Sequence, residues 1–401
     1  MGRTVTRRAL MAEAGIGAGV AMLGLGASAL AAQDPIQGFE KAQTDTEAWK
    51  RWKPVSDRKV RVGIAGYGVC SFGAAFGFQN HPNVTVAAVT DLIPERCAEL
   101  ARVCGCQKTY PSCEEMIKDD SLEAIFVATD AVSHARLAIA ALKAGKHVAS
   151  AVPAVFGSIE DAHALLDAVK RTGRKYMLFE TSYFHDDLFL MRELFKGGHL
   201  GRVLFAEGEY YHYSPEPIDS YKGWRIGLPP QWYPTHSNAY YTGVTAAPFT
   251  EVSCMGIPSV VEHLKPANNR YKNAFGTEIA LFRAADGGVA RMAVSWDTPG
   301  VSGEMGRIRT DKGTVYGSFM AEGGAGAAPA IHKPALPPGV EAGGHGGSHG
   351  YLMSEFVEAI LMDRKPLVDV AQALTMTVGG IVAHQSAQRG GELLKIPQFR
   401  I

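Results

Sequence analysis

The chain has 401 residues, of which 46% are hydrophobic, so roughly two or three domains with a buried core are expected. Lysine plus arginine equals aspartate plus glutamate at 40 each, and no basic block stands out. Because proteins that bind nucleic acid carry a basic patch for the phosphates, this balance argues against DNA or RNA as a partner.

Residues 1–33 have the pattern of an export signal. Thr6-Arg7-Arg8 is a twin-arginine motif, and a weakly hydrophobic, glycine-rich stretch leads to a small-residue cleavage site at Ala29-Leu30-Ala31. The alternative is an uncleaved anchor over residues 14–32, but its glycines and alanines make a poor lipid-facing helix. We therefore predict export by the twin-arginine route to the periplasm or the medium, without stable membrane insertion after cleavage.

A polar arm, residues 34–58, precedes a glycine turn. Apolar residues alternate from Val60 to Ile64 and lead into Gly66-Tyr67-Gly68-Val69-Cys70. Gly66 permits a tight turn, and Gly68 lets the backbone approach a pyrophosphate. The G-x-G-x-x-G spacing is only partly kept, because Ser71 stands at the third position and Gly73 follows. We interpret residues 66–70 as the turn of a dinucleotide site, against the alternative of a plain strand-to-helix turn.

An acidic residue, Asp91, follows the next predicted strand, residues 84–89. Asp91 stands where a carboxylate would accept hydrogen bonds from the hydroxyls of the adenosine ribose. The same charge would repel a 2′-phosphate. The sequence therefore predicts NAD, rather than NADP, as the cofactor.

Helical and apolar segments alternate after Asp91. The spacing predicts helices at 94–103, 113–118 and 133–144, and strands at 124–128 and 146–149, the last stopping before Pro153. Strands that alternate with helices in this way form a parallel, doubly wound sheet. We predict a Rossmann domain over residues 59–178 and a second domain over 179–401.

The six cysteines carry no evident chemistry. Cys97, Cys104, Cys106 and Cys113 lack the paired C-x-x-C spacing of zinc sites, and folding in the cytoplasm disfavours disulfides before export. We interpret them as small core residues and predict no metal site.

Several motifs of the first half resemble one enzyme family. Residues 124–129, Ser133-His134, residues 141–148 and Pro153 are similar to the Gfo/Idh/MocA oxidoreductases, NAD(P)-dependent enzymes that act mostly on sugars and cyclitols. The resemblance implies an α/β second domain with an open, mainly antiparallel sheet that commonly packs against another subunit, hence a homo-oligomer. It also places Thr129, His134, Val152 and Pro153 near the cofactor.

One departure from the family affects the chemistry. The family usually has Glu-Lys-Pro where this chain has Ala151-Val152-Pro153, and that lysine ordinarily moves the hydroxyl proton as hydride leaves. Valine has no proton to exchange. Either the protein has lost catalysis, or another residue is the base.

Two further motifs resemble a particular branch of the family. Tyr233-Pro234-Thr235-His236 and Gly344-His345-Gly346-Gly347 are similar to the NAD-dependent family 109 glycoside hydrolases, known for α-N-acetylgalactosaminidase activity. Those enzymes oxidise the sugar at C3, eliminate the aglycone across C1 and C2, add water and return the hydride. Regenerating NAD within each turnover suits an exported protein that meets little free NAD. The resemblance implies Tyr233 and His236 as the acid/base pair, against the alternative that both only pack a loop.

Aromatic and histidine residues nearby are candidate contacts for a carbohydrate or glycoside. They are Trp224, Arg225 and Trp232 in one loop, and His345 and His349 in the segment 322–350, which is rich in glycine, alanine and proline and is expected to be a surface loop. The branch continues its glycine motif with Met-Asp, whereas this chain has Ser348-His349, so the sugar could differ. Net sugar dehydrogenation and a non-catalytic nucleotide-fold binding protein remain the alternative functions.

Overall fold

The computed structural model describes residues 41–68, 70–321 and 329–401. The predicted export signal, the start of the arm and Val69, one of the expected cofactor residues, lie outside the described residues. Within the described ranges no helix is both long and apolar enough to cross a bilayer. The described part of the arm carries one short 3₁₀ turn, η1 (Ala48–Arg51).

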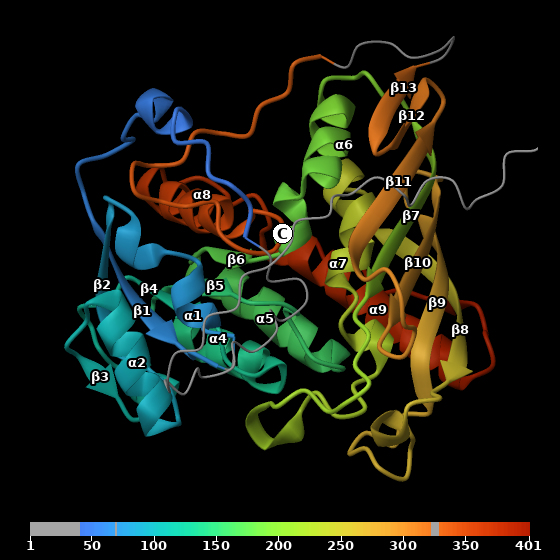
Figure 1. The fold of residues 1–401 in the computed structure, drawn as a ribbon, viewed down its shortest axis with the longest axis horizontal. Helices are drawn as coiled ribbons and strands as arrows, with labels where there is room; N and C mark the ends of the chain where they lie inside the picture. The colour runs from blue at the N-terminus through green and yellow to red at the C-terminus, as the bar shows by residue number, and fades with distance from the viewer. Residues whose placement is uncertain (1–40, 69, 322–328) are drawn as a thin grey trace, which may run out of the picture. The chain divides into compact units, whose positions relative to one another are not determined.

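The first half of the described chain is a six-stranded parallel sheet in the order β3-β2-β1-β4-β5-β6 (Figure 1). Its strands are β1 (Val60–Ala65), β2 (Val84–Thr90), β3 (Thr109–Tyr110), β4 (Ala124–Val127), β5 (His147–Ser150) and β6 (Tyr176–Leu178). Its helices are α1 (Phe72–Ala75), α2 (Pro94–Cys104), α3 (Cys113–Ile117), α4 (His134–Lys143) and α5 (Ile159–Thr172). The strand order reverses between β1 and β4, where such sheets leave a crevice beyond the carboxyl ends of the strands.

Local signals in the sequence account for these helices. Pro94 stands in the first turn of α2, and Gly105, with φ +60°, ends it. The Ser158 hydroxyl caps α5 by accepting from the Asp161 amide. The predicted alternation is thus confirmed, although the helix after the glycine turn is a single turn long. All six cysteines are free thiols, and every one except Cys70 is buried.

The second half is built on an eight-stranded sheet in the order β13-β12-β11-β7-β10-β9-β8-β14. The strands are β7 (Val203–Tyr211), β8 (Phe249–Pro258), β9 (Phe275–Ala284), β10 (Val289–Ser295), β11 (Gly303–Thr310), β12 (Gly313–Tyr316), β13 (Ser318–Ala321) and β14 (Leu394–Lys395). Every neighbouring pair is antiparallel except β7 and β10, which run parallel. The open, mainly antiparallel sheet implied by the family resemblance is therefore confirmed.

Helices of the second half are divided between the two sheets. α6 (Asp186–Lys196) and α7 (Thr235–Asn238) contact strands of the eight-stranded sheet, and α8 (His349–Leu361) contacts β1 of the parallel sheet (Figure 1). α9 (Val370–Gln388) contacts both sheets, through β8 on one side and β6 on the other. Short 3₁₀ and π turns complete the chain: η2 (Phe78–Asn80), η3 (Ala131–Ser133), η4 (Thr181–Phe184), η5 (Tyr221–Gly223), η6 (Pro230–Trp232), η7 (Ala239–Gly243) and η8 (Glu262–Leu264).

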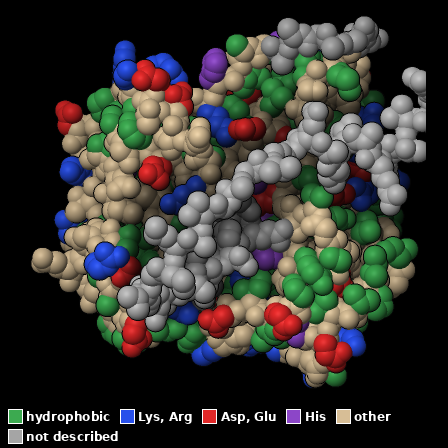
Figure 2. Space-filling model, in the orientation of Figure 1, with side chains coloured by type: hydrophobic (Ala, Val, Ile, Leu, Met, Phe, Trp, Pro, Cys, Tyr) green, Lys and Arg blue, Asp and Glu red, His purple; other side chains and the backbone are tan. Residues whose placement is uncertain are grey.

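The face of the eight-stranded sheet that points away from α6, α7 and α9 exposes apolar side chains. Figure 2 shows hydrophobic groups gathered over the region where Figure 1 places these strands. The exposed apolar side chains of this sheet include Leu204, Met255, Leu281, Val289, Met305 and Met320, each from a different strand. An exposed apolar face of this kind is typical of an interaction surface.

The prediction of a surface loop over residues 322–350 is partly wrong. Residues 329–348 contain no helix, but Leu336, Val340 and Ala342 are buried, and α8 begins at His349, inside the predicted loop. The reason is tertiary, because the arm pairs with this segment through Ala42 and Gly343.

A buried carboxylate ties the second sheet to the loop in front of it. Glu278 on β9 accepts a hydrogen bond from the Gln231 amide at 2.7 Å and lies 2.6 Å from Nδ1 of His384 on α9. All three side chains are buried. Since Gln231 closely precedes Tyr233 and His236, this contact fixes the segment that carries both.

Replacing Glu278 by leucine should lower the free energy of unfolding by about 3–5 kcal/mol, because two buried polar groups lose their partner. Glu278→Gln keeps an acceptor oxygen and should cost about 1–2 kcal/mol. Urea denaturation measures both, with the exposed Glu115→Leu as the control. Equal stability of Glu278→Leu and wild type would contradict this prediction.

Candidate active site

A single cavity of about 640 Å³ brings together most of the predicted site residues. The Rossmann half contributes Gly66, Gly68, Cys70, Asp91, Thr129, His134 and Val152 to its wall. The second half contributes Tyr210, Trp224, Arg225, Tyr233, His236, Glu304 and His345. The cavity therefore extends from the glycine turn at the carboxyl end of β1 to the histidine loops of the second half.

The glycine turn has the shape that a dinucleotide requires. Gly66 has φ +99°, and a Cβ there would come within 2.4 Å of the Ala128 carbonyl oxygen. A Cβ on Gly73 would lie 2.1 Å from the Gly66 carbonyl oxygen, so the turn packs directly on α1. Gly68, with φ +66°, faces open space instead. The two close approaches and the open side at Gly68 fit a pyrophosphate beside the backbone.

Asp91 is held firmly beside this turn. Its Oδ2 accepts from the amides of Tyr67 at 2.8 Å and Gly68 at 3.3 Å, and its Oδ1 accepts from the Ile93 amide at 2.9 Å. The carboxylate thus stands at the carboxyl end of β2, on the wall of the cavity. A fixed negative charge in this place disfavours a 2′-phosphate.

His134 joins two loops rather than presenting a free ring to the cavity. Its Nδ1 lies 3.0 Å from the Pro153 carbonyl oxygen and its Nε2 lies 3.1 Å from that of Thr129. Burial lowers the pKa of His134. The ring therefore positions Val152, whose apolar side chain stands on the cavity wall where the family has its lysine.

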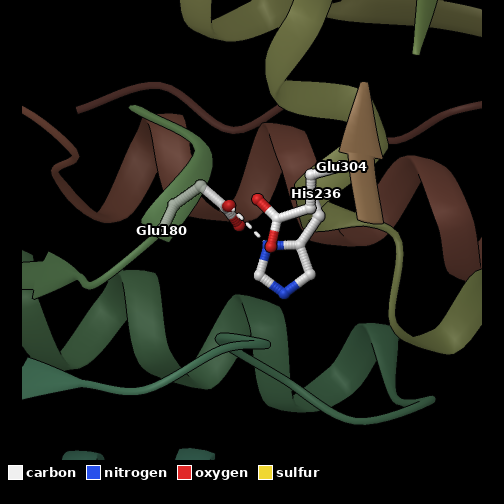
Figure 3. Close-up of side chains that lie close together, drawn as sticks. All are labelled: Glu180, His236 and Glu304. Carbon is white, nitrogen blue, oxygen red and sulfur yellow. Dashed lines mark hydrogen bonds and ion pairs between the residues drawn. The ribbon is translucent and has the colours of Figure 1, made fainter. Parts of the chain in front are cut away.

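Two carboxylates converge on His236 (Figure 3). Glu180, which precedes η4, places Oε1 2.7 Å from Nδ1 of His236, and Glu304 on β11 places Oε1 3.5 Å from the same nitrogen. The other ring nitrogen points away from both acids. The Ser182 hydroxyl and amide donate to Glu304 and Glu180 respectively. Three separate elements thus meet at one imidazole edge.

This arrangement keeps His236 protonated. Burial alone would lower its pKa, but the carboxylates of Glu180 and then Glu304 outweigh burial and raise the pKa to about 9. His236 in turn holds the pKa of Glu180 below its usual value, although burial acts in the opposite direction. At neutral pH His236 is therefore an imidazolium and a proton donor, not a base.

The same three residues are a possible metal-binding set, since their ligand atoms lie within 4.8 Å of one another. In this structure Glu180 Oε1 accepts the Nδ1 proton of His236 at 2.7 Å. The cluster is an ion pair with a second acid beside it.

The aromatic side chains beside His236 also keep their protons. Burial raises the pKa of Tyr233, and the nearby Arg225 only partly opposes this shift. The guanidinium carbon of Arg225 lies 4.3 Å from the ring centre of Trp224 and 5.8 Å from that of Tyr233. Tyr210 packs edge-on against His236, with ring centres 4.6 Å apart. Tyr233 is therefore suited to donate a hydrogen bond rather than to abstract a proton.

The two histidines of the glycine loop have different surroundings. His345 lines the cavity, and burial, followed by the neighbouring histidines, lowers its pKa well below the usual value. His349 lies behind it, with Nε2 2.8 Å from Nδ1 of His345. The cavity thus combines a neutral histidine, His345, with a charged one, His236, which is the combination that acid/base chemistry uses.

Some predicted contacts lie elsewhere, and some site residues were missed. Trp232 packs against Phe156 and Tyr271 outside the cavity wall, and His349 reaches it only through His345. Glu180 and Glu304 were not predicted, because they are distant in sequence from His236. The position of Glu180 just beyond a buried strand was the one available signal.

A family model with the description "Oxidoreductase family, NAD-binding Rossmann fold" matches residues 60–180; it is the Gfo/Idh/MocA model. The match covers the Rossmann part of the chain. The protein is accordingly an NAD-dependent enzyme of oxidoreductase type, and the glycine turn with Asp91 is where this chain would hold NAD. This confirms the cofactor predicted from the sequence.

Relatives of this chain include proteins named as family 109 glycosyl hydrolases. The chain is 26% identical over 442 residues to such a protein from Saccharopolyspora erythraea, covering 98% of this chain and 94% of the relative. A shorter match, 30% identical over 165 residues, to a Bacteroides fragilis glycosyl hydrolase family 109 protein covers 38% of this chain and 35% of that relative. The first match extends the similarity through the second half.

Solved structures share the fold. An oxidoreductase domain protein from Kribbella flavida superposes with a TM-score of 0.69 at 20% identity, covering 85% of this chain and 100% of that chain. A levoglucosan dehydrogenase in complex with NADH and levoglucosan gives a TM-score of 0.69 at 19% identity, with the same coverages. At these identities the likeness concerns the fold alone.

Replacing Asp91 by alanine should weaken NAD binding about tenfold, because the ribose loses its hydrogen-bond acceptor. It should also raise the affinity for NADP relative to NAD, because the charge that repels the 2′-phosphate is removed. Isothermal titration of cofactor-stripped protein with each dinucleotide measures the ratio. Asp120→Ala, an exposed acid, is the control. An unchanged NAD/NADP ratio would contradict the assignment of Asp91.

The Glu180–His236 pair should make stability depend on pH in a defined direction. Because folding raises the pKa of His236 from 6.5 to about 9, the stabilisation is complete below pH 6.5 and is lost as the pH rises through about 9. Wild type should therefore exceed Glu180→Gln in melting temperature most near pH 6.5, with the difference shrinking towards pH 9 and above. Calorimetry at both pH values tests this, and a constant difference would rule it out.

Proposed function

We propose that this protein is an exported, NAD-dependent glycosidase that oxidises a sugar hydroxyl and returns the hydride within the same turnover. One observation carries the proposal. The cavity that begins at the NAD turn has Val152 in the place of the lysine but holds a neutral histidine, His345, and a charged one, His236. The family 109 names of the relatives support the same chemistry.

NAD, held at the glycine turn beside Asp91, would supply the redox chemistry, which is the removal of a hydride from the sugar carbon bearing the hydroxyl and its return at the end. In the first half-reaction the hydroxyl proton must leave as the hydride leaves. His345 is the neutral base available in the cavity for this proton. The imidazolium of His236 and the hydroxyl of Tyr233 then stabilise the new ketone oxygen by donating hydrogen bonds to it.

The new ketone acidifies the hydrogen on the neighbouring carbon, and this makes elimination of the aglycone possible. A base removes that hydrogen, the C1–O bond breaks, and an acid protonates the departing oxygen. Water then adds across the double bond in the reverse sense, and the hydride returns to the ketone carbon. The sum is a glycoside plus water giving a sugar plus an alcohol, with NAD unchanged.

The lining of the cavity suits a carbohydrate. Tyr210 and Trp224 offer aromatic faces, and Arg225 adds a cation held against Trp224. Apolar sugar faces stack on such rings while their hydroxyls bond the rim. Net sugar dehydrogenation is the second candidate, favoured by Ser348-His349, which departs from the branch that the glycine loop otherwise resembles.

Export and assembly are parts of the proposal. Thr6-Arg7-Arg8 supports transport of a folded protein with its cofactor loaded, and a redox-neutral cycle needs no exchange of NAD outside the cytoplasm. The exposed apolar face of the eight-stranded sheet supports a homo-oligomer. Fractionation of expressing cells and the native mass of the purified protein test these two points.

Purified protein should release p-nitrophenol from one or more aryl glycosides over many turnovers without added NAD. In D₂O the sugar product should carry deuterium at C2, because elimination exchanges that hydrogen whereas direct hydrolysis does not. Release limited to one equivalent, with lasting reduction of the nicotinamide, would instead indicate the net dehydrogenase.

His345→Gln, Tyr233→Phe and His236→Gln should each lower kcat by about 10²–10⁴-fold while the dinucleotide stays bound. The matched control is His163→Gln, an exposed histidine on α5. Variants with wild-type rates would remove the substituted residue from the reaction.

A further inference from the structure

The contact between His349 and His345 fixes which nitrogen of each ring carries a proton. Nδ1 of His349 lies 3.2 Å from the Ala75 carbonyl oxygen, which can only accept, so this nitrogen is the donor. Burial lowers the pKa of His349 to about 4, so the ring is neutral and its Nε2 carries the lone pair. Nε2 therefore accepts the Nδ1 proton of His345 across 2.8 Å.

The protonation of His345 at Nδ1 determines the state of its other ring nitrogen. A neutral imidazole has one protonated nitrogen. With its proton on Nδ1, His345 carries its lone pair on Nε2, the nitrogen opposite the contact with His349. The backbone carbonyl of Ala75 thus determines, through one intervening ring, which nitrogen of His345 is basic.

Packing holds this chain of hydrogen bonds in place. The ring of His349 is 2% exposed and stacks on Phe76 with centres 4.2 Å apart and planes 26° apart. Phe72 meets its edge at 5.7 Å. A Cβ on Gly343 would come 2.9 Å from the His349 Cβ, so the glycine loop lies directly on this residue.

The N-terminal arm secures the loop from the other side. The Ala42 amide donates to the Gly343 carbonyl oxygen at 3.1 Å, and the Ala342 amide donates to the Thr44 hydroxyl at 2.9 Å. The indole of Trp49 donates to the Val340 carbonyl oxygen at 3.1 Å. The loop that carries His345 is therefore fixed on both sides.

The ionisable groups that face the pair are mostly histidines. Besides burial, the charges of His236, His185 and His212 lower the pKa of His345, and those of His185 and Lys41 lower the pKa of His349. Glu304 is an acid beside this group, with Oε2 3.4 Å from Nε2 of His185. Protonating His345 brings a positive charge close to the imidazolium of His236, which keeps His345 neutral in the resting protein.

We propose that His349 is a positioning residue that holds His345 in the tautomer with Nε2 as its proton acceptor. The inference rests on the proposed function for the catalytic role of His345, whereas the tautomer itself is a property of the folded protein. His349 does not touch the sugar or the cofactor. It acts through the orientation and protonation pattern of His345.

Nitrogen NMR of the ¹⁵N-histidine-labelled holoenzyme tests the tautomer directly, with His345→Gln used to assign the signals. Wild type should show His345 protonated at Nδ1 and unprotonated at Nε2. In His349→Phe, which keeps the stack on Phe76 but lacks an acceptor, the Nε2–H form should appear. An unchanged His345 spectrum in His349→Phe would overturn the inference.

Kinetics separate positioning from simple packing. His349→Phe should lower kcat about 10–100-fold with little change in KM, and the acid limb of the pH profile should move to lower pH because the cation of His345 loses an acceptor. His349→Gln offers both an acceptor oxygen and an N–H donor, and should restore both readouts. Equal losses in the two variants would show a structural role only.

The two experiments distinguish the failure of this inference from that of the proposed function. If wild type hydrolyses no glycoside but the tautomer changes in His349→Phe, positioning stands and the glycosidase proposal fails. If wild type turns over and His349→Phe matches it in rate, pH profile and spectrum, the positioning inference fails alone.

Discussion

The buried contact between Glu180 and His236 is the interaction on which the site depends. It links the carboxyl end of β6, the last strand of the parallel sheet, to α7 in front of the eight-stranded sheet, and β11 adds Glu304 to the same imidazole edge. A buried charge needs a partner, and here each member of the pair supplies one for the other. Because the contact spans the two sheets, the relative placement of the glycine turn and the histidine loops depends on it.

The two histidines of the cavity differ in protonation state because their surroundings differ. His236 lies between acids and keeps its proton, whereas His345 lies among other histidines and loses it. The residues are chemically identical, and their opposite states give the cavity an acid and a base at one pH. In the proposed reaction, this division would take the place of the lysine that the family has where this chain has Val152.

Contacts between segments that are distant in the chain form the surroundings of His345. The arm, the segment ending at Gly350 and the one-turn α1 all meet behind His345, although they are far apart in the chain. The loop is glycine-rich because it lies directly on neighbouring groups: a Cβ on Gly350 would come within 2.1 Å of the Glu341 carbonyl oxygen. A segment that reads as a loose connection is thus a packed wall of the site.

Local periodicity and glycine geometry were enough to predict the parallel sheet, the glycine turn and Asp91, whereas the mainly antiparallel second sheet followed from the family resemblance. That resemblance also singled out Tyr233, His236 and His345. The fold alone sets the protonation of these residues, since Glu180 and Glu304 approach His236 from other elements. It likewise decided that Trp232 packs away from the cavity and that His349 acts behind His345, because the direction of a side chain on a loop depends on what the rest of the chain places against it.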